Sequence, residues 1–402
     1  MHSTIAQPHA RAPSEVGLSD RPLPLRRAAV YCVSVLLLSR VGLTVVSLLA
    51  GRLHGSGPVG VPGWPAPNAQ GVAELVGTAL ERWDALWFLR IAADGYAVSD
   101  GSAAFWPGYP LATRALAAAM GGHTLGAALV ISAIFSLAAL VLFYLLGTRE
   151  FGEPLARRSV MYLALFPTAF FLAAPYSESM FLCFSVAALL AARSKHWWVA
   201  ALCAALASGT RSLGVVLTVP LALEALAQQR HLHRGGVARI ASVMGPVAAG
   251  LSGAAAYLAY WGLRSGNMLQ PFSSQAQWLR TASWPWETLS QATNFAWRFD
   301  ALWHRIDWLL VIPFMALALW SLRWMRASYA AYIWGSFAVI LSFVFPARPL
   351  MSVPRFLLVL FPLFWALARL TDRTSLHLAV ALGLGAGQAL IAAFFVAWYP
   401  MF

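Results

Sequence analysis

Long apolar runs recur along this chain and constrain its fold more than any other feature. They follow one another from residue 28 to residue 398, and no polar stretch between them is long enough for a water-soluble domain. Hydrophobic residues make up 60% of the 402 residues and charged residues 11%, and the mean hydropathy is +0.67. A soluble domain carries about a quarter charged residues. The sequence therefore excludes an ordinary soluble protein and indicates a polytopic membrane protein.

A membrane-spanning helix needs about 20 mostly apolar residues. The sequence predicts about eleven such helices, at 28–50, 124–147, 158–174, 177–193, 197–209, 213–228, 238–262, 306–322, 328–345, 355–370 and 376–398. The predicted fold class is an all-α membrane domain over residues 26–402. Residues 1–25 contain little apolar sequence and are predicted to form a disordered cytoplasmic tail.

The positive charge is explained better by membrane topology than by nucleic-acid binding. The net charge is +13, but its cations are scattered between apolar runs. With the N-terminus in the cytoplasm, 16 of the 28 cations fall in the short inner segments and 11 in the much longer outer ones. The positive-inside rule then predicts that the two long stretches 51–123 and 263–305 lie outside a plasma (inner) membrane.

The sequence shows no pattern of side chains that would indicate metal binding or thiol chemistry. The three cysteines, Cys32, Cys183 and Cys203, lie inside apolar runs, where cysteine acts as a small hydrophobic residue. The outer segments contain no Asp-x-Asp pair, and their histidines show no ligand spacing. We expect neither a metal nor a cofactor.

The first outer stretch contains a polar group in an aromatic setting. Read as a helix over about 73–93 that Gly95 closes, it places Trp83 and Trp87 on one face, with Asp84 beside Trp87. Such an amphipathic helix would hold Asp84 at the outer membrane surface. The same spacing fits a plain interfacial helix whose aspartate is solvated or paired with an arginine.

Four further charged residues lie near membrane depth, where ionisable groups are costly and are functional candidates. Glu178 is expected at the outer end of a helical hairpin, where it would also suit the helix dipole. Arg211 separates two short apolar runs, a position that fits a simple turn as well. Arg348 and Arg355 lie at the outer mouth of the bundle, and an anionic headgroup would explain them.

Several sequence blocks carry a resemblance when taken in order. They are Trp83-Asp84-x-x-Trp87-Phe88-x-x-Ile91-Ala92-x-x-Gly95-Tyr96, Trp106-Pro-x-Tyr109-Pro110, Phe166-Pro-x-Ala-Phe-Phe with Tyr176-Ser-Glu178-Ser, Thr210-Arg211-x-x-Gly214, Gly266-Asn267 with Gln275-Ala-Gln277-Trp278, and Arg355-Phe356 with Phe361-Pro-Leu-Phe. Together they resemble the PIG-V family, the mannosyltransferases that add the second mannose of the GPI anchor in eukaryotes and that have bacterial relatives, and the chain is expected to be a bacterial member. The chain departs from the family pattern at Arg82, Met268 and Phe356.

The resemblance implies a metal-independent, inverting glycosyltransferase of the GT-C class, with amphipathic helices in a large first outer loop. Such an enzyme takes a sugar, here mannose, from a polyprenyl-phosphate carrier in the bilayer and passes it to a glycolipid or cell-envelope glycan outside the membrane. The acid of the first outer loop is the expected catalytic residue, which corresponds to Asp84 as general base. Arginines suit the phosphate and aromatic rings suit the sugar. The expected substrate-binding residues are Arg82, Trp83, Trp87, Tyr96, Trp106, Tyr109, Tyr176, Glu178, Arg211, Gln275, Trp278, Arg348 and Arg355.

Two other functions stay open at the level of sequence. A lipid or solute transporter is expected to show internal symmetry and interrupted helices in matching halves, and we find no such repeat. The same fold could also transfer a pentose or glucose, or serve without activity as a subunit of a cell-wall assembly.

Overall fold

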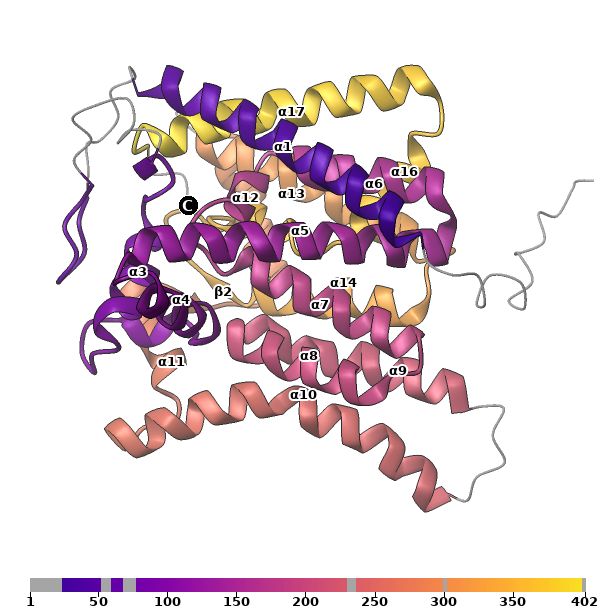
Figure 1. Cartoon of the computed structure of the whole chain (residues 1–402), viewed down its shortest axis with the longest axis horizontal. Coiled ribbons are helices and arrows are strands. Elements are labelled where there is room, and N and C mark those ends of the chain that lie inside the picture. Colours follow the sequence, from indigo (N-terminus) through magenta and orange to yellow (C-terminus); the bar gives the residue numbers. More distant parts are fainter. Residues whose placement is uncertain (1–23, 52–58, 68–76, 230–235, 299–301, 400–402) are drawn as a thin grey trace, which may run out of the picture.

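The computed structural model describes residues 24–51, 59–67, 77–229, 236–298 and 302–399, and these form a bundle of helices (Figure 1). Its first half comprises α1 Leu25–Ala50, α3 Asp84–Asp94, η1 Ser102–Ala104, α4 Gly108–Ala119, α5 Thr124–Phe151, α6 Glu153–Leu165, η2 Ala169–Leu172, α7 Glu178–Arg193, α8 Trp197–Thr210, η3 Ser212–Leu217 and α9 Thr218–Gln229. The second half comprises α10 Gly236–Ser265, α11 Gln270–Ser273, η4 Ser274–Trp278, β1 Thr281–Ala282, α12 Pro285–Ala296, α13 Leu302–Ser321, α14 Ala327–Leu341, β2 Phe343–Val344, α15 Val353–Leu357, α16 Pro362–Leu370 and α17 Thr374–Val396. The all-α prediction is confirmed. The predicted tail lies almost wholly outside the described residues.

Four helices in the described part of the chain, α1, α5, α13 and α17, are long and apolar enough to cross a membrane. Three shorter apolar helical stretches accompany them, at Trp197–Thr210, Ser212–Gln228 and Ala327–Leu341. The chain is a multi-pass membrane protein. The predicted count of eleven spans is not confirmed, since several of the expected helices are short or broken.

Prolines explain one of these breaks. The run 158–174 was expected to be one span, but α6 ends at Leu165 and only the short turn η2 follows. Phe166 has φ −56° and ψ 142°, outside the helical region, because the residue before a proline, here Pro167, disfavours the α conformation. The run 355–370 is likewise divided, between α15 and α16.

The helix predicted over 73–93 is interrupted in the structure. Residues 77–78 are helical, 79–83 are not, and α3 starts at Asp84, while residues 68–76 lie outside the described part. It ends as predicted at Gly95, whose φ of 88° suits glycine. All residues from Ala85 to Ala92 are buried, so α3 packs inside the protein. These residues of α3 therefore pack against other parts of the protein and do not lie free at a surface.

Several of the short elements lie together at one end of the long helices. Figure 1 shows α3, α4 and α11 there, with α9 and α16 near the other end. At the first end, β1 pairs antiparallel with β2, with Thr281 opposite Val344 and Ala282 opposite Phe343. This pairing joins the segment after η4 to the segment before α15, although some 60 residues separate β1 from β2 in the sequence.

Candidate active site

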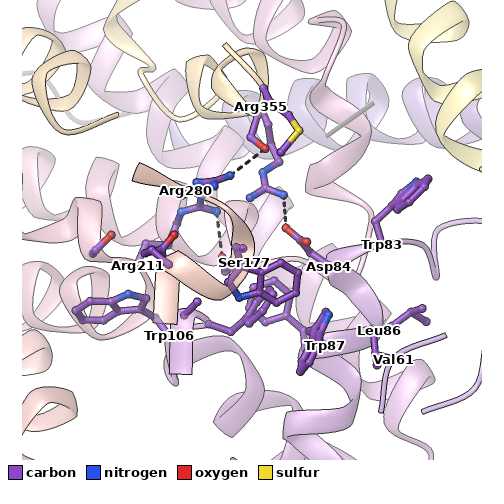
Figure 2. A pocket seen from close by; sticks show the side chains of 18 of the residues that line it. Val61, Trp83, Asp84, Leu86, Trp87, Trp106, Ser177, Arg211, Arg280 and Arg355 are labelled. Atoms are coloured by element: carbon purple, nitrogen blue, oxygen red, sulfur yellow. Dashed lines mark hydrogen bonds and ion pairs between the residues drawn. The ribbon is translucent and has the colours of Figure 1, made fainter. Parts of the chain in front are cut away.

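A cavity of about 470 Å³ opens among the short elements at this end of the bundle (Figure 2). Segments distant in the sequence contribute to its wall: the start of α3, the residues around η1, the α8 to η3 junction, η4 with Arg280, and α15. The lining residues are Val59, Gly60, Val61, Pro62, Trp83, Asp84, Leu86, Trp87, Phe88, Ala104, Phe105, Trp106, Ser177, Thr210, Arg211, Ser212, Gln275, Trp278, Arg280, Met351, Ser352, Arg355 and Phe356.

Asp84 is the acid that lines this cavity. It is the first residue of α3, and its Oδ2 accepts a hydrogen bond of 2.7 Å from Arg355 Nη1. Arg355 is 8% exposed, whereas the Asp84 side chain keeps 30% of its surface accessible. Among the described residues, Oδ1 of Asp84 has no hydrogen-bond partner. One carboxylate oxygen is thus fixed by a guanidinium while the other is available to accept a proton.

Glu178 lies behind this pair as a shared counter-charge. It is fully buried, and its Oε1 lies 2.6 Å from Arg211 Nη1 and 2.9 Å from Arg355 Nε. Arg211 also donates to Ser177 Oγ over 3.1 Å. Because charge-assisted contacts of this kind fix the planar guanidinium, Glu178 orients the two arginines at the cavity wall.

A third cation at the cavity, Arg280, was missed by the sequence interpretation. It is half-buried, and its Nη2 donates a 3.3 Å hydrogen bond to Ser352 Oγ. In the part of the chain that the structure describes, no carboxylate lies within 4.0 Å of it. Burial lowers the pKa of the Arg280 guanidinium and neighbouring Arg355 lowers it further, which Asp84 partly offsets. An anion placed beside Arg280 would relieve this unfavourable setting.

Arg280 also borders a second hollow of about 420 Å³, which is mainly apolar. Its lining comprises Ala276, Leu279, Arg280, Thr281, Phe345, Pro346 and Ala347. The two hollows therefore share Arg280. The first is lined by charged and aromatic groups, whereas the second is mainly apolar.

Aromatic rings form the wall opposite the guanidinium groups (Figure 2). Trp87 stacks on Phe105 at 5.7 Å, and Trp278 meets these two rings edge-on at 5.2 and 5.5 Å. Trp106 lies against Tyr257 of α10 at 5.1 Å. Flat rings beside hydrogen-bonding groups are suited to bind a sugar, whose faces are apolar and whose edge is polar.

The sequence interpretation located part of this cavity. Eight of the predicted site residues line it: Trp83, Asp84, Trp87, Trp106, Arg211, Gln275, Trp278 and Arg355. Six do not: Arg82, Tyr96, Tyr109, Tyr176, Glu178 and Arg348. Of these six, Glu178 adjoins the cavity through its two arginines, and the other five serve the surrounding structure.

Arg348 was predicted to contact the phosphate, but it does not line the cavity. Its Nε and Nη2 pair with the two carboxylate oxygens of Asp307 at 2.6 and 2.8 Å, and both side chains are buried. The sequence contains no local signal for this pair, because the two residues are 41 positions apart and lie on different elements.

Substrate binding was also predicted for Tyr96, Tyr109 and Tyr176, and these residues do not line the cavity either. The hydroxyl of Tyr96 donates to Phe105 O, and that of Tyr109 to Ala128 O. The hydroxyl of Tyr176 donates to Arg82 O over 3.0 Å. Each ring is packed against other aromatic rings and satisfies its hydroxyl inside the protein, as buried tyrosines usually do.

Comparison with known proteins now agrees with the sequence blocks. The family model Mannosyltransferase (PIG-V) matches residues 63–230, which include Asp84, Glu178 and Arg211. The resemblance to the PIG-V family is confirmed over this segment. The GPI alpha-1,6-mannosyltransferase 2 of Cricetulus griseus is 37% identical over 147 residues, which cover 34% of this chain and 30% of that protein. The protein of the same name from Homo sapiens is 34% identical over the same shares. The chain thus matches about a third of the length of these relatives.

Among solved structures, ArnT from Cupriavidus metallidurans, bound to undecaprenyl phosphate, shows 15% identity and a TM-score of 0.49, covering 85% of this chain and 60% of ArnT. The oligosaccharyltransferase of Archaeoglobus fulgidus shows 13% identity and a TM-score of 0.46, covering 91% of this chain and 53% of the other.

Proposed function

We propose that the protein is a membrane-embedded glycosyltransferase of the GT-C class that moves a mannosyl group from polyprenyl-phosphate-mannose to a hydroxyl of a glycolipid or cell-envelope glycan. The observation that carries the proposal is the convergence of Asp84 with three arginines in one aromatic cavity. The family match over residues 63–230 supports the sugar class.

The chemistry requires a base on one side of the anomeric carbon and a cationic site on the other. Asp84 Oδ1 takes the proton of the acceptor hydroxyl, whose oxygen attacks the anomeric carbon. The bond from that carbon to the phosphate oxygen breaks, and its electron pair leaves with the lipid phosphate. A single displacement of this kind inverts the anomeric configuration. It uses no metal, and the described residues contain no cluster of three His, Cys, Asp or Glu side chains that could hold one.

The charge of the cavity suits the donor. Three guanidinium groups and the two carboxylates of Asp84 and Glu178 leave one positive charge unbalanced, and a sugar phosphodiester carries one negative charge. As the phosphate leaves, it gains a second negative charge. Desolvated guanidinium groups therefore stabilise the transition state more strongly than the ground state. The apolar hollow beside Arg280 supports a donor whose phosphate bears a hydrocarbon chain.

Transfer of radiolabelled sugar tests the proposal. Purified protein is incubated with polyprenyl-phosphate-mannose and a membrane lipid extract, and labelled product is measured. Asp84→Asn removes the base and is expected to lower transfer by about 10² to 10⁴-fold, with normal expression. The matched control is Asp94→Asn, at the other end of α3, where the side chain is exposed and does not line the cavity.

Each outcome has a distinct meaning. Near-normal turnover by Asp84→Asn contradicts the mechanism. Labelling from a pentose or glucose donor and not from the mannose donor keeps the class but changes the sugar. A wild-type protein that makes no product from any polyprenyl-phosphate sugar overturns the enzymatic proposal.

A further inference from the structure

The backbone immediately before Asp84 adopts a conformation that L residues rarely use. Trp83 has φ 56° and ψ −122°, and it is both the residue that precedes α3 and part of the cavity wall. Such conformers persist only where the surroundings impose them, and they concentrate at functional sites. The structure should therefore contain a device that holds Trp83, and with it the start of α3.

Arg82 supplies one part of that device. It is buried, and its guanidinium does not face the cavity. Its Nε donates to Val396 O at the end of α17 over 3.2 Å, and its Nη1 donates to Thr78 O over 2.6 Å. Its own carbonyl accepts the Tyr176 hydroxyl. Both the guanidinium and the backbone carbonyl of Arg82 are thereby held by other parts of the protein.

Trp398 supplies the other part. Its indole ring lies under the Arg82 guanidinium at 4.7 Å and meets the Trp83 ring edge-on at 5.5 Å. Trp398 is 6% exposed and itself has a positive φ of 65°. Two strained tryptophans from distant parts of the sequence thus touch beside the proposed base. Figure 1 shows the end of α17 at the same end of the bundle as α3.

The end of α17 is in turn anchored to α13. Phe394 meets Trp303 edge-on at 5.2 Å, and the Arg348 guanidinium lies 5.9 Å from the Trp303 ring. Arg348 is held by its pair with Asp307, also on α13. These contacts give the end of α17 a fixed position from which it can hold another segment.

We propose that Trp398 is a positioning residue for Asp84. Val396 and Trp398 grip Arg82 and Trp83, a set of contacts that we call the α17 clasp, and the clasp fixes where the Asp84 carboxylate lies relative to Arg355 and the acceptor. The inference rests on the proposed function of Asp84. Arg82 then acts by holding the backbone, and its effect falls on the rate of the chemical step, not on donor binding.

Steady-state kinetics of sugar transfer test the clasp. Trp398→Leu removes the ring and is expected to lower kcat by about 10 to 100-fold with both KM values within about twofold, since a displacement of about 1 Å can cost about 10² in rate. Trp398→Phe keeps an aromatic ring and is expected to recover most of the rate. Arg82→Lys keeps the charge but loses the planar fork, and it should give the same kcat defect.

The matched control is Trp365→Leu. Trp365 is fully buried on α16, near the opposite end of the bundle, and stacks on Phe143 at 5.4 Å (Figure 1). It should lower the melting temperature in detergent at least as much as Trp398→Leu, with kcat of the folded protein within about twofold. Kinetics are measured on monodisperse protein at equal folded concentration.

Three results would overturn the inference. Trp398→Leu could keep its kcat, or Arg82→Lys could raise the donor KM without lowering kcat. Alternatively, Trp398→Leu and Trp365→Leu could lose kcat equally. If one of these results is found and Asp84→Asn is inactive, the proposed function still stands. If Asp84→Asn is active, the proposed function itself is contradicted.

Discussion

At the scale of single residues, Arg280 has the clearest unmet requirement. Arg211 and Arg355 already have carboxylate partners, whereas Arg280 is half-buried and, among the described residues, lies within ion-pair distance of none. The Ser352 hydroxyl cannot neutralise it. We infer that the lipid phosphate does.

Replacing Arg280 tests this inference. Arg280→Gln is expected to lower kcat/KM for the donor by about 100-fold, corresponding to about 3 kcal/mol for a lost donor to a developing anion. Arg280→Lys keeps the charge but loses the planar fork, so its kcat/KM should lie between those of the wild type and Arg280→Gln. The control is Arg298→Gln, an exposed arginine outside the cavity, which should match wild type. Equal kcat/KM in Arg280→Gln and Arg298→Gln would show that the phosphate binds elsewhere.

The chemical type of a residue was a better guide to the candidate site than its position in the sequence. Asp84 was selected through the family resemblance, since its spacing alone also fits an interfacial helix. Arg211 and Arg355 could be selected from the sequence because an ionisable group near membrane depth needs a partner or a function. The same rule selected Arg348, wrongly, because its partner Asp307 is brought to it only by packing of the helices. It missed Arg280, which reaches the cavity through the pairing of β1 with β2. Tyrosines near a motif did not reveal whether their rings faced the cavity or the core.

At the scale of elements, the approach of α4 to α8 determines the wall that carries Arg211. Gly108 begins α4 and lies against the end of α8. A Cβ at Gly108 would meet Thr210 Cα at 2.9 Å and Gly209 O at 3.2 Å, both backbone atoms that cannot swing aside. The neighbouring residues, Trp106 and Arg211, both line the cavity.

Gly108→Ala is therefore expected to separate α4 from α8, to destabilise the protein by about 1 to 3 kcal/mol and to lower transfer. The control is Gly126→Ala in α5, where the nearest atom to an added Cβ is Met120 Cε at 3.5 Å, an ordinary contact. That change should be neutral or slightly stabilising, as alanine favours a helix by about 1 kcal/mol. Thermal unfolding in detergent and the transfer assay measure both effects. A fully active, equally stable Gly108→Ala would contradict the argument.

Element boundaries were the part of the fold that apolar periodicity could not supply. Hydropathy correctly predicted long helices such as α1, α5 and α17, because such runs have few alternatives in a bilayer. It joined α6 to η2 across Pro167, and the aromatic spacing joined α3 to the residues before it, although 79–83 are not helical. These errors fall where the chain bends to place Asp84 or the residues behind it, so the interruptions belong to the site.

At the scale of the whole molecule, polar groups collect at two opposite ends. One end carries the cavity with Asp84 and its arginines. Near the other end, Glu224 is buried and binds Arg193 at 2.8 Å and Ser328 Oγ at 3.2 Å, while Glu150 binds Arg193 at 2.6 Å. This network ties α5, α7, α9 and α14 together. The short segments predicted to be cytoplasmic, which include those around Arg193 and Arg326, carry 16 of the 28 cations, and this asymmetry predicts that this end faces the cytoplasm.

We therefore expect the cavity to open on the outer side of the membrane. Single cysteines test this in a background where Cys32, Cys183 and Cys203 are replaced by alanine. Ser99→Cys lies in the exposed loop after α3, and Ser375→Cys in the exposed first turn of α17 at the opposite end. A membrane-impermeant maleimide applied to intact cells should label position 99 and spare position 375, which should react once the membrane is permeabilised. The reverse pattern would place the cavity inside, and the acceptor would then have to be a cytoplasmic or inner-leaflet glycan.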